Sequence, residues 1–171
     1  GGRFIEVSKA SGLQLRNPAT GVPAAKTLGV APVDLDGDGW MDLVVANDTV
    51  QNFVFHNQRN GTFAEIGAQS GIAFDSYGNA RGAMGIDWSD AKAGGSALAI
   101  GNFSNEMKSF YWTDTGDVFL DLSPASGVAR NSLLALTFGV NRLQDYAPYC
   151  KIMADAAAFG QERGIKLVLK P

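Results

Sequence analysis

The chain repeats itself, and this internal repetition restricts the folds open to it. The segment GRFIEVSKASGL at residues 2–13 recurs as GTFAEIGAQSGI at 61–72 and as GDVFLDLSPASGV at 116–128. A second phrase recurs in step with the first, because LVVAN at 43–47 is answered 55 residues later by LAIGN at 98–102. Two independent phrases that share one period indicate a duplicated structural unit of about 55 residues.

Each unit is predicted to contain four short strands, separated by Gly, Asn and Asp turn signals. The eight strands are expected near residues 28–33, 42–47, 52–57, 62–66, 82–87, 96–101, 108–113 and 117–122. A ninth strand is expected near residue 134, and GRFIEV at residues 2–7 has the pattern of the outer strand of a preceding unit. Repeated four-stranded units are typical of β-propeller blades. The sequence therefore predicts an all-β fold, a partial β-propeller of two complete four-stranded antiparallel blades with flanking strands.

Composition narrows the classes of partner. Of 171 residues, 46% are apolar and 18% are charged, and the net charge is −3. Such a chain can fold around a buried core but presents no basic field for a phosphate backbone, which argues against nucleic acid as a partner. None of its apolar runs approaches the roughly 18 residues of a membrane span, so membrane insertion is not expected. Cys150 is the sole cysteine, so an intrachain disulfide is excluded.

The stretch DLDGDGWMD at residues 34–42 gathers four aspartates between two predicted strands. Aspartates at alternate positions can point into one hollow when the chain curls at a glycine, and hard oxygen donors in this order suit Ca²⁺. The candidate metal ligands are the carboxylates of Asp34, Asp36, Asp38 and Asp42, together with the main-chain oxygen of Trp40. The alternative is a plain solvated Asp/Gly turn, which needs only one or two such residues.

The second unit offers an internal comparison for this loop. At a uniform offset of 55, the four aspartates fall on Ser89, Ala91, Ala93 and Ala97. Gly39 falls on Gly94, so the turn is retained while the carboxylates are lost. We therefore expect one unit that binds metal and one that does not.

Taken together, the DxDGDGxxD loop, the LVVAN strand after it and NGTFAEIGAQSGI resemble the FG-GAP/VCBS repeat proteins, in particular the type associated with ASPIC/UnbV domains. The resemblance covers residues 1 to about 140. It implies a β-propeller with calcium in the loop that joins the first two strands of a blade. It also implies that the four aspartates and Trp40 are the calcium ligands, in a secreted or surface module for adhesion or ligand binding.

The last residues follow a different pattern. YCKIMADAAAFGQERG has helical spacing and IKLVLK has the pattern of a buried strand, so 141–171 is predicted to form a short α/β tail. A helix followed by a strand is half of a parallel α/β unit, which has no place in an antiparallel blade. This tail resembles a helix-to-strand step of sugar isomerase-like (β/α)8 barrels. The chain is thus divided into a partial propeller at 1–140 and an unrelated tail at 141–171.

The function expected from these features is a non-catalytic, calcium-binding module for adhesion, ligand binding or scaffolding. By the resemblance it is extracellular, periplasmic or on the cell surface. Its partner would be a protein or a glycan, with self-association possible through open blade edges. The alternative is a fragment of a carbohydrate-active enzyme, either a polysaccharide-active propeller or a sugar isomerase-like barrel.

Three smaller features are interpreted as structural. His56, the sole histidine, is expected to be a surface or partly buried strand residue rather than a catalytic or zinc-binding one. Ser11, Ser70 and Ser126 recur with the repeat, which marks them as turn formers rather than nucleophiles. Asn47, Asn60 and Asn102 begin short glycosylation sequons, but asparagine is frequent in such turns.

Overall fold

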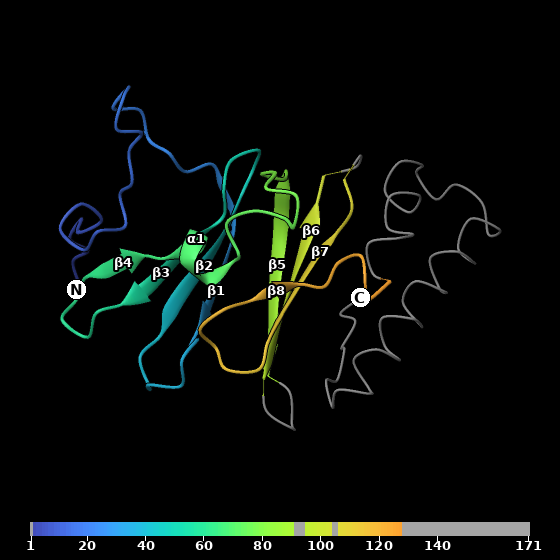
Figure 1. Cartoon of the computed structure of the whole chain (residues 1–171). Coiled ribbons are helices and arrows are strands. Elements are labelled where there is room, and N and C mark those ends of the chain that lie inside the picture. Colours follow the sequence, from blue (N-terminus) through green and yellow to red (C-terminus); the bar gives the residue numbers. More distant parts are fainter. Residues whose placement is uncertain (1, 91–94, 104–105, 128–171) are drawn as a thin grey trace.

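The computed structural model describes residues 2–90, 95–103 and 106–127, and it contains two four-stranded antiparallel sheets (Figure 1). The elements are β1 (Thr27–Val33), β2 (Asp42–Asn47), β3 (Phe53–Asn57), β4 (Phe63–Glu65), α1 (Gly67–Ser70), β5 (Ala83–Asp90), β6 (Ser96–Asn102), β7 (Ser109–Thr113) and β8 (Leu120–Asp121). All eight strands fall where the repeat predicts them. The all-β prediction is therefore confirmed, and the arrangement is consistent with two neighbouring blades of a propeller-type fold.

Both sheets are simple meanders, because each strand pairs with the next strand along the chain. The strand orders are β1-β2-β3-β4 and β5-β6-β7-β8. The two sheets share a register detail, since a bulge follows Thr27 in β1 and Ala83 in β5. Strand β2 is buried on both faces, which explains why DLVVAN is continuously apolar between its polar ends.

The two sheets stack on one another, so that a single core forms between them (Figure 1). This inter-sheet core comprises Ala31, Val33, Leu35, Val44, Ala46, Val54, Ile72, Ala83, Leu98, Ile100, Tyr111 and Phe119. The opposite face of the first sheet is covered by the N-terminal arm, residues 13–26, whose Leu13 and Leu15 pack against Phe53 and Phe55. Both faces of the first sheet are therefore occupied.

The recurring Ser-Gly phrase forms the joint between successive units. The main-chain carbonyl of Ser11 accepts a hydrogen bond from the amide of Phe63 at 2.8 Å. One unit later, the carbonyl of Ser70 accepts one from the amide of Phe119 at 2.7 Å. Each hydroxyl donates to a carbonyl three residues back, which confirms the prediction that these serines form turns. The repeat in the sequence is thus also a repeat of hydrogen bonds between units.

One strand prediction is wrong, and three other predictions lie outside the described residues. Residues 2–7 form no strand, and Phe4 and Ile5 are fully or largely exposed. A strand needs a partner, and residues 2–7 take part in none of the strand pairings among the described residues. The strand expected near residue 134, the tail at 141–171 and the division at residue 140 lie outside the described residues. Among the described residues, no helix has the length and apolar character needed to cross a membrane.

Candidate metal centre

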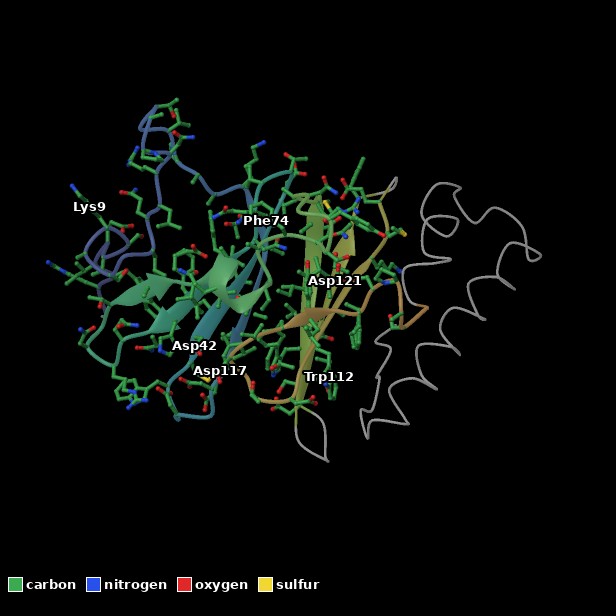
Figure 2. The ribbon with its side chains drawn as sticks, viewed as in Figure 1. Lys9, Asp42, Phe74, Trp112, Asp117 and Asp121 are labelled. Atoms are coloured by element: carbon green, nitrogen blue, oxygen red, sulfur yellow. The ribbon has the colours of Figure 1, made fainter. Side chains whose placement is uncertain are left out.

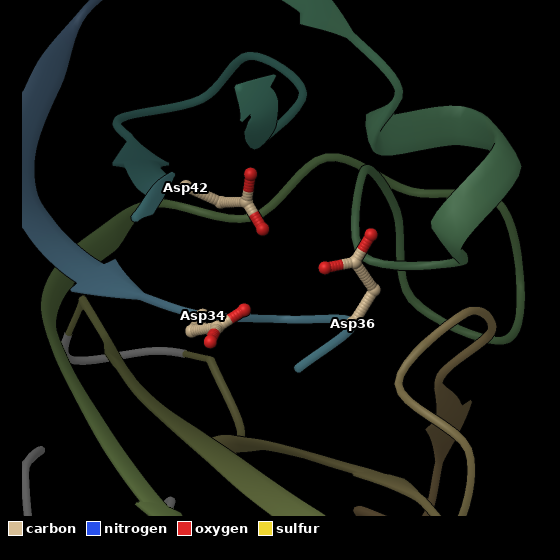
Figure 3. A group of neighbouring side chains, drawn as sticks. All are labelled: Asp34, Asp36 and Asp42. Carbon is tan, nitrogen blue, oxygen red and sulfur yellow. The ribbon is translucent and has the colours of Figure 1, made fainter. Parts of the chain in front are cut away.

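The aspartate loop, residues 34–41, joins β1 to β2 at one end of the first sheet. Ligand oxygens of Asp34, Asp36 and Asp42 all lie within 4.8 Å of one another. Figure 3 shows the three carboxylates facing a common space. Calcium binds oxygen at about 2.3–2.6 Å, so ligands on opposite sides of one ion are separated by about 5 Å. The spacing of these three carboxylates therefore fits a single bound ion.

Asp42 is the anchored member of this group. Its side chain is 1% exposed, although it is an ionisable group at a loop boundary. One carboxylate oxygen accepts the amide of Leu35 at 3.1 Å, and the other accepts the amide of Asn57 at 2.7 Å. The Nδ1 atom of His56 lies 3.1 Å from this second oxygen. These contacts hold the carboxylate in place without any ion, and they explain how it can be buried.

Asp34 shapes the loop because its carboxylate accepts hydrogen bonds from main-chain amides later in the loop. One of its oxygens accepts the amide of Asp38 at 3.0 Å, and the other accepts the amide of Gly39 at 2.9 Å. The amide of Asp38 also approaches a carboxylate oxygen of Asp36 at 3.2 Å. The loop backbone is consequently wrapped around the same carboxylates that would bind a cation.

Asp38 lies apart from the group of three. It forms an ion pair with Arg59 from the β3–β4 turn, with 2.5 Å between the guanidinium nitrogen and the carboxylate oxygen. The amide of Trp40 donates to Asp38 at 2.7 Å. This hydrogen bond, helped by Arg59, holds the pKa of Asp38 below its ordinary value against the opposing effect of burial. The roles of Asp38 and of the Trp40 carbonyl as metal ligands stay predictions.

Electrostatics favours a cation at this place. Two carboxylates about 4 Å apart repel by about 1 kcal/mol even in water, and three of them form three such pairs. A divalent ion between them converts this repulsion into attraction. Carboxylate oxygens are the donors that Ca²⁺ prefers, so the chemistry of the donor set and its spacing agree.

The second sheet does not reproduce the group. The pairing of Val33 with Asp42 corresponds to that of Ser89 with Ala97. The first strands, β1 and β5, are therefore related by an offset of 56, whereas β2 and β6 keep the offset of 55. Asp90 therefore occupies the place of Asp34. One of its oxygens accepts the Trp88 indole N–H at 3.0 Å and the Ser96 hydroxyl at 2.9 Å. In the part of the chain that the structure describes, the first loop holds the one cluster of three acidic groups suited to a metal.

Sequence reasoning missed the residues that support the loop from β3 and the turn after it. His56 is a partly buried strand residue, as expected, but its contact with Asp42 was not foreseen. Arg59 and Asn57 were likewise not singled out. The available signal was the pairing of β2 with β3, which brings the end of β3 beside the start of β2.

The three sequons differ in exposure. Asn47 and Asn102 are buried, and their side-chain nitrogens donate to the carbonyls of Gln51 and Met107. Asn60 is exposed, and its side-chain oxygen accepts the Thr62 hydroxyl. Of these three asparagines, the folded structure leaves Asn60 accessible to modification.

A groove of about 630 Å³ lies at the other end of the first sheet, between the N-terminal arm and the β2–β3 turn. Its apolar lining includes Leu15, Val22, Val50, Phe53 and Phe74. Arg16 and Lys26 also line it, and no acidic side chain of the described residues does. The groove therefore combines apolar surface with positive charge in a chain whose net charge is −3.

Two stacked four-stranded sheets, with an aspartate loop between the first two strands, are consistent with a propeller-type repeat fold. Residues 34–92 match the family model of the FG-GAP-like repeat. This match confirms the FG-GAP part of the resemblance, whereas the ASPIC/UnbV association and the barrel-like tail stay predictions. No curated protein matches the chain in a sequence comparison.

Proposed function

We propose that residues 34–42 bind calcium and that the chain serves as a calcium-stabilised, non-catalytic binding module. The observation that carries the proposal is the convergence of Asp34, Asp36 and Asp42 within 4.8 Å. This convergence occurs at the start of the segment that matches the FG-GAP-like repeat. The first loop holds three close carboxylates, whereas the corresponding loop of the second unit lacks them. Binding of a cation to the first loop would account for this difference.

The partner is proposed to be a protein or a glycan, met outside the cell, in the periplasm or at the cell surface. The groove beside the N-terminal arm supports a binding role, because it offers apolar surface together with Arg16 and Lys26. It lies at the opposite end of β2 from the aspartate loop, since the β1–β2 and β2–β3 connections leave opposite ends of that strand. In this proposal calcium stabilises the scaffold and does not contact the ligand.

The experiment that tests calcium binding is thermal unfolding with and without millimolar Ca²⁺. We expect calcium to raise the melting temperature by several degrees, because an ion bound to the folded state stabilises it by mass action. Asp36→Ala should remove the increase, since it deletes one ligand of the group.

Asp90→Ala is the matched control, because Asp90 occupies the corresponding place in the second sheet but belongs to no such group. It should retain the calcium-dependent increase. A wild-type melting temperature that is the same in calcium and in chelator would overturn the proposal.

A further inference from the structure

The aspartate loop has a neighbour from the other sheet. The turn between β7 and β8, residues 114–119, lies beside the loop at the same end of the stacked sheets (Figure 1). The turn contacts the loop at Gly116, where a Cβ atom would lie 2.1 Å from the carbonyl oxygen of Leu35 and 3.4 Å from the Cα of Asp36. The backbone of this turn therefore lies directly against Leu35, the residue between the candidate ligands Asp34 and Asp36.

The close approach requires glycine at this position for two reasons. Gly116 has a φ of +86°, a conformation that other residues rarely adopt, and any side chain would collide with Leu35. The turn is fixed from its own side as well, because the amide of Gly116 donates to the hydroxyl of Thr113 at 2.9 Å. The contact is thus a built feature of the two sheets and not a chance approach of a loose loop.

Leu35 links this contact to the metal centre. Its side chain is buried in the inter-sheet core, and its amide donates to the carboxylate of Asp42 at 3.1 Å. One residue therefore touches the second sheet with its side chain and its carbonyl while its amide positions a candidate ligand. A shift of the second sheet would move Leu35 and, with it, the spacing of the carboxylates.

The turn also brings negative charge. Asp117 follows Gly116 directly, and Figure 2 shows it at the same end of the sheets as Asp42. Consecutive Cα atoms are about 3.8 Å apart, so the backbone of Asp117 lies within about one Debye length of the aspartate loop. The turn that borders the aspartate loop therefore carries an exposed acidic residue of its own.

We infer that the β7–β8 turn is the second wall of the cation site, so that calcium binding to the first sheet and docking of the second sheet stabilise each other. Gly116 is the positioning residue of this wall. The inference rests on the proposed calcium binding and adds to it that the neighbouring sheet helps to set the affinity. By linkage, docking of the second sheet raises the calcium affinity by the same factor by which bound calcium strengthens docking.

Two measurements on the full chain test the inference. The first is calorimetric titration with Ca²⁺, in which Gly116→Ala should weaken affinity at least tenfold. Gly78→Ala is the matched control, because Gly78 has a φ of +79° but nothing within 4 Å of a Cβ atom. It should bind calcium within about twofold of wild type.

The second measurement uses the wild-type chain and stays informative if Gly116→Ala does not fold. Amide hydrogen exchange followed by NMR should show that calcium slows exchange at Gly116 and Phe119, in the second sheet, at least tenfold. Slowed exchange confined to residues 34–42, with wild-type affinity in Gly116→Ala where that variant folds, would overturn the inference while leaving the proposed function intact. No calcium binding by the wild-type chain would overturn both.

Discussion

The acidic side chains of the loop contribute differently to stability, because they differ in burial. Asp42 is 1% exposed and accepts hydrogen bonds from two main-chain amides, whereas Asp36 is exposed. Asp42 therefore contributes to folding before any ion is considered. Asp36 contributes mainly negative charge, which is unfavourable beside its neighbours until a cation is bound.

This difference predicts losses of stability of different size in chelator. Asp42→Ala should lower the free energy of unfolding by about 2–3 kcal/mol, because the amides of Leu35 and Asn57 and the ring of His56 lose their acceptor. Asp36→Ala should change it by no more than about 0.5 kcal/mol, as is usual for exposed positions. Urea unfolding in chelator measures both values. Equal losses in the two variants would show that the carboxylates are not differently anchored.

The sequence indicates part of this site and could not indicate the rest. Alternate spacing and the nearby strand start bring Asp34, Asp36 and Asp42 together, because these relations are local. The pairing of Asp38 with Arg59 spans 21 residues and depends on where the β3–β4 turn lies, which spacing does not reveal. The contact of His56 with Asp42 likewise follows from strand pairing rather than from any motif.

At the scale of the elements, one carboxylate organises the connection between the two sheets, residues 71–82. Asp75 accepts the amides of Tyr77 and Asn79 and forms an ion pair with Arg81. Its side chain is only 6% exposed. Burial tends to raise the pKa of Asp75, but these hydrogen bonds and Arg81 outweigh it and lower the pKa below its ordinary value. The ionised form therefore stabilises the connection.

The sign of the shift sets the pH range of the next prediction. A carboxyl whose pKa is lowered by folding stabilises the protein fully above its unfolded pKa of about 3.9, and this contribution is lost as pH falls through the folded pKa. Asp75→Asn should cost about 1–3 kcal/mol near neutral pH, and the difference from wild type should shrink below about pH 4. Urea unfolding of both proteins across that range measures it. A difference that stays constant with pH would argue against the ion pair.

Strand positions are the best-predicted elements, and strand ends are the least. β2 was expected at 42–47 and is found there, since an apolar run between turn residues is a local signal. The strand expected at 117–122 shortens to Leu120–Asp121, because residues 114–119 form the turn against the aspartate loop. The uniform offset of 55 was one residue short for the first strand of each sheet, β1 and β5. Such shifts are set by pairing between strands and are not visible in the repeat itself.

At the scale of the whole molecule, the stacked sheets depend on a joint that repeats once per unit. At the second joint, Gly71 has a φ of +82°, and a Cβ there would lie 2.5 Å from the carbonyl oxygen of Phe119. Gly12 stands in the same relation to Phe63, at 2.6 Å. The glycine of the Ser-Gly phrase is therefore required, because the backbone of the next unit approaches it closely.

Gly71→Ala should accordingly destabilise the fold by about 2–3 kcal/mol, through backbone strain together with the collision. Gly21→Ala is the control, because Gly21 has a φ of +68° but open space around it, so strain alone should cost about 1 kcal/mol. Equilibrium unfolding in urea compares the two. Equal losses of unfolding free energy in the two variants would show that the joint accommodates a methyl group. The contact at Gly71 would then not determine how the sheets stack.

The matched segment, residues 34–92, begins after β1 has ended and runs past the end of β5. One copy of this segment thus encodes three strands of one sheet and the first strand of the next. A gene that gained or lost one copy at these boundaries would still produce complete sheets. Every junction would join the first strand of a sheet, β1 or β5, to three following strands. A cut placed between the sheets would keep β1, the aspartate loop and β2 within one copy. Recombination at the matched boundaries instead moves the whole aspartate loop together with β2 and joins it to a different first strand.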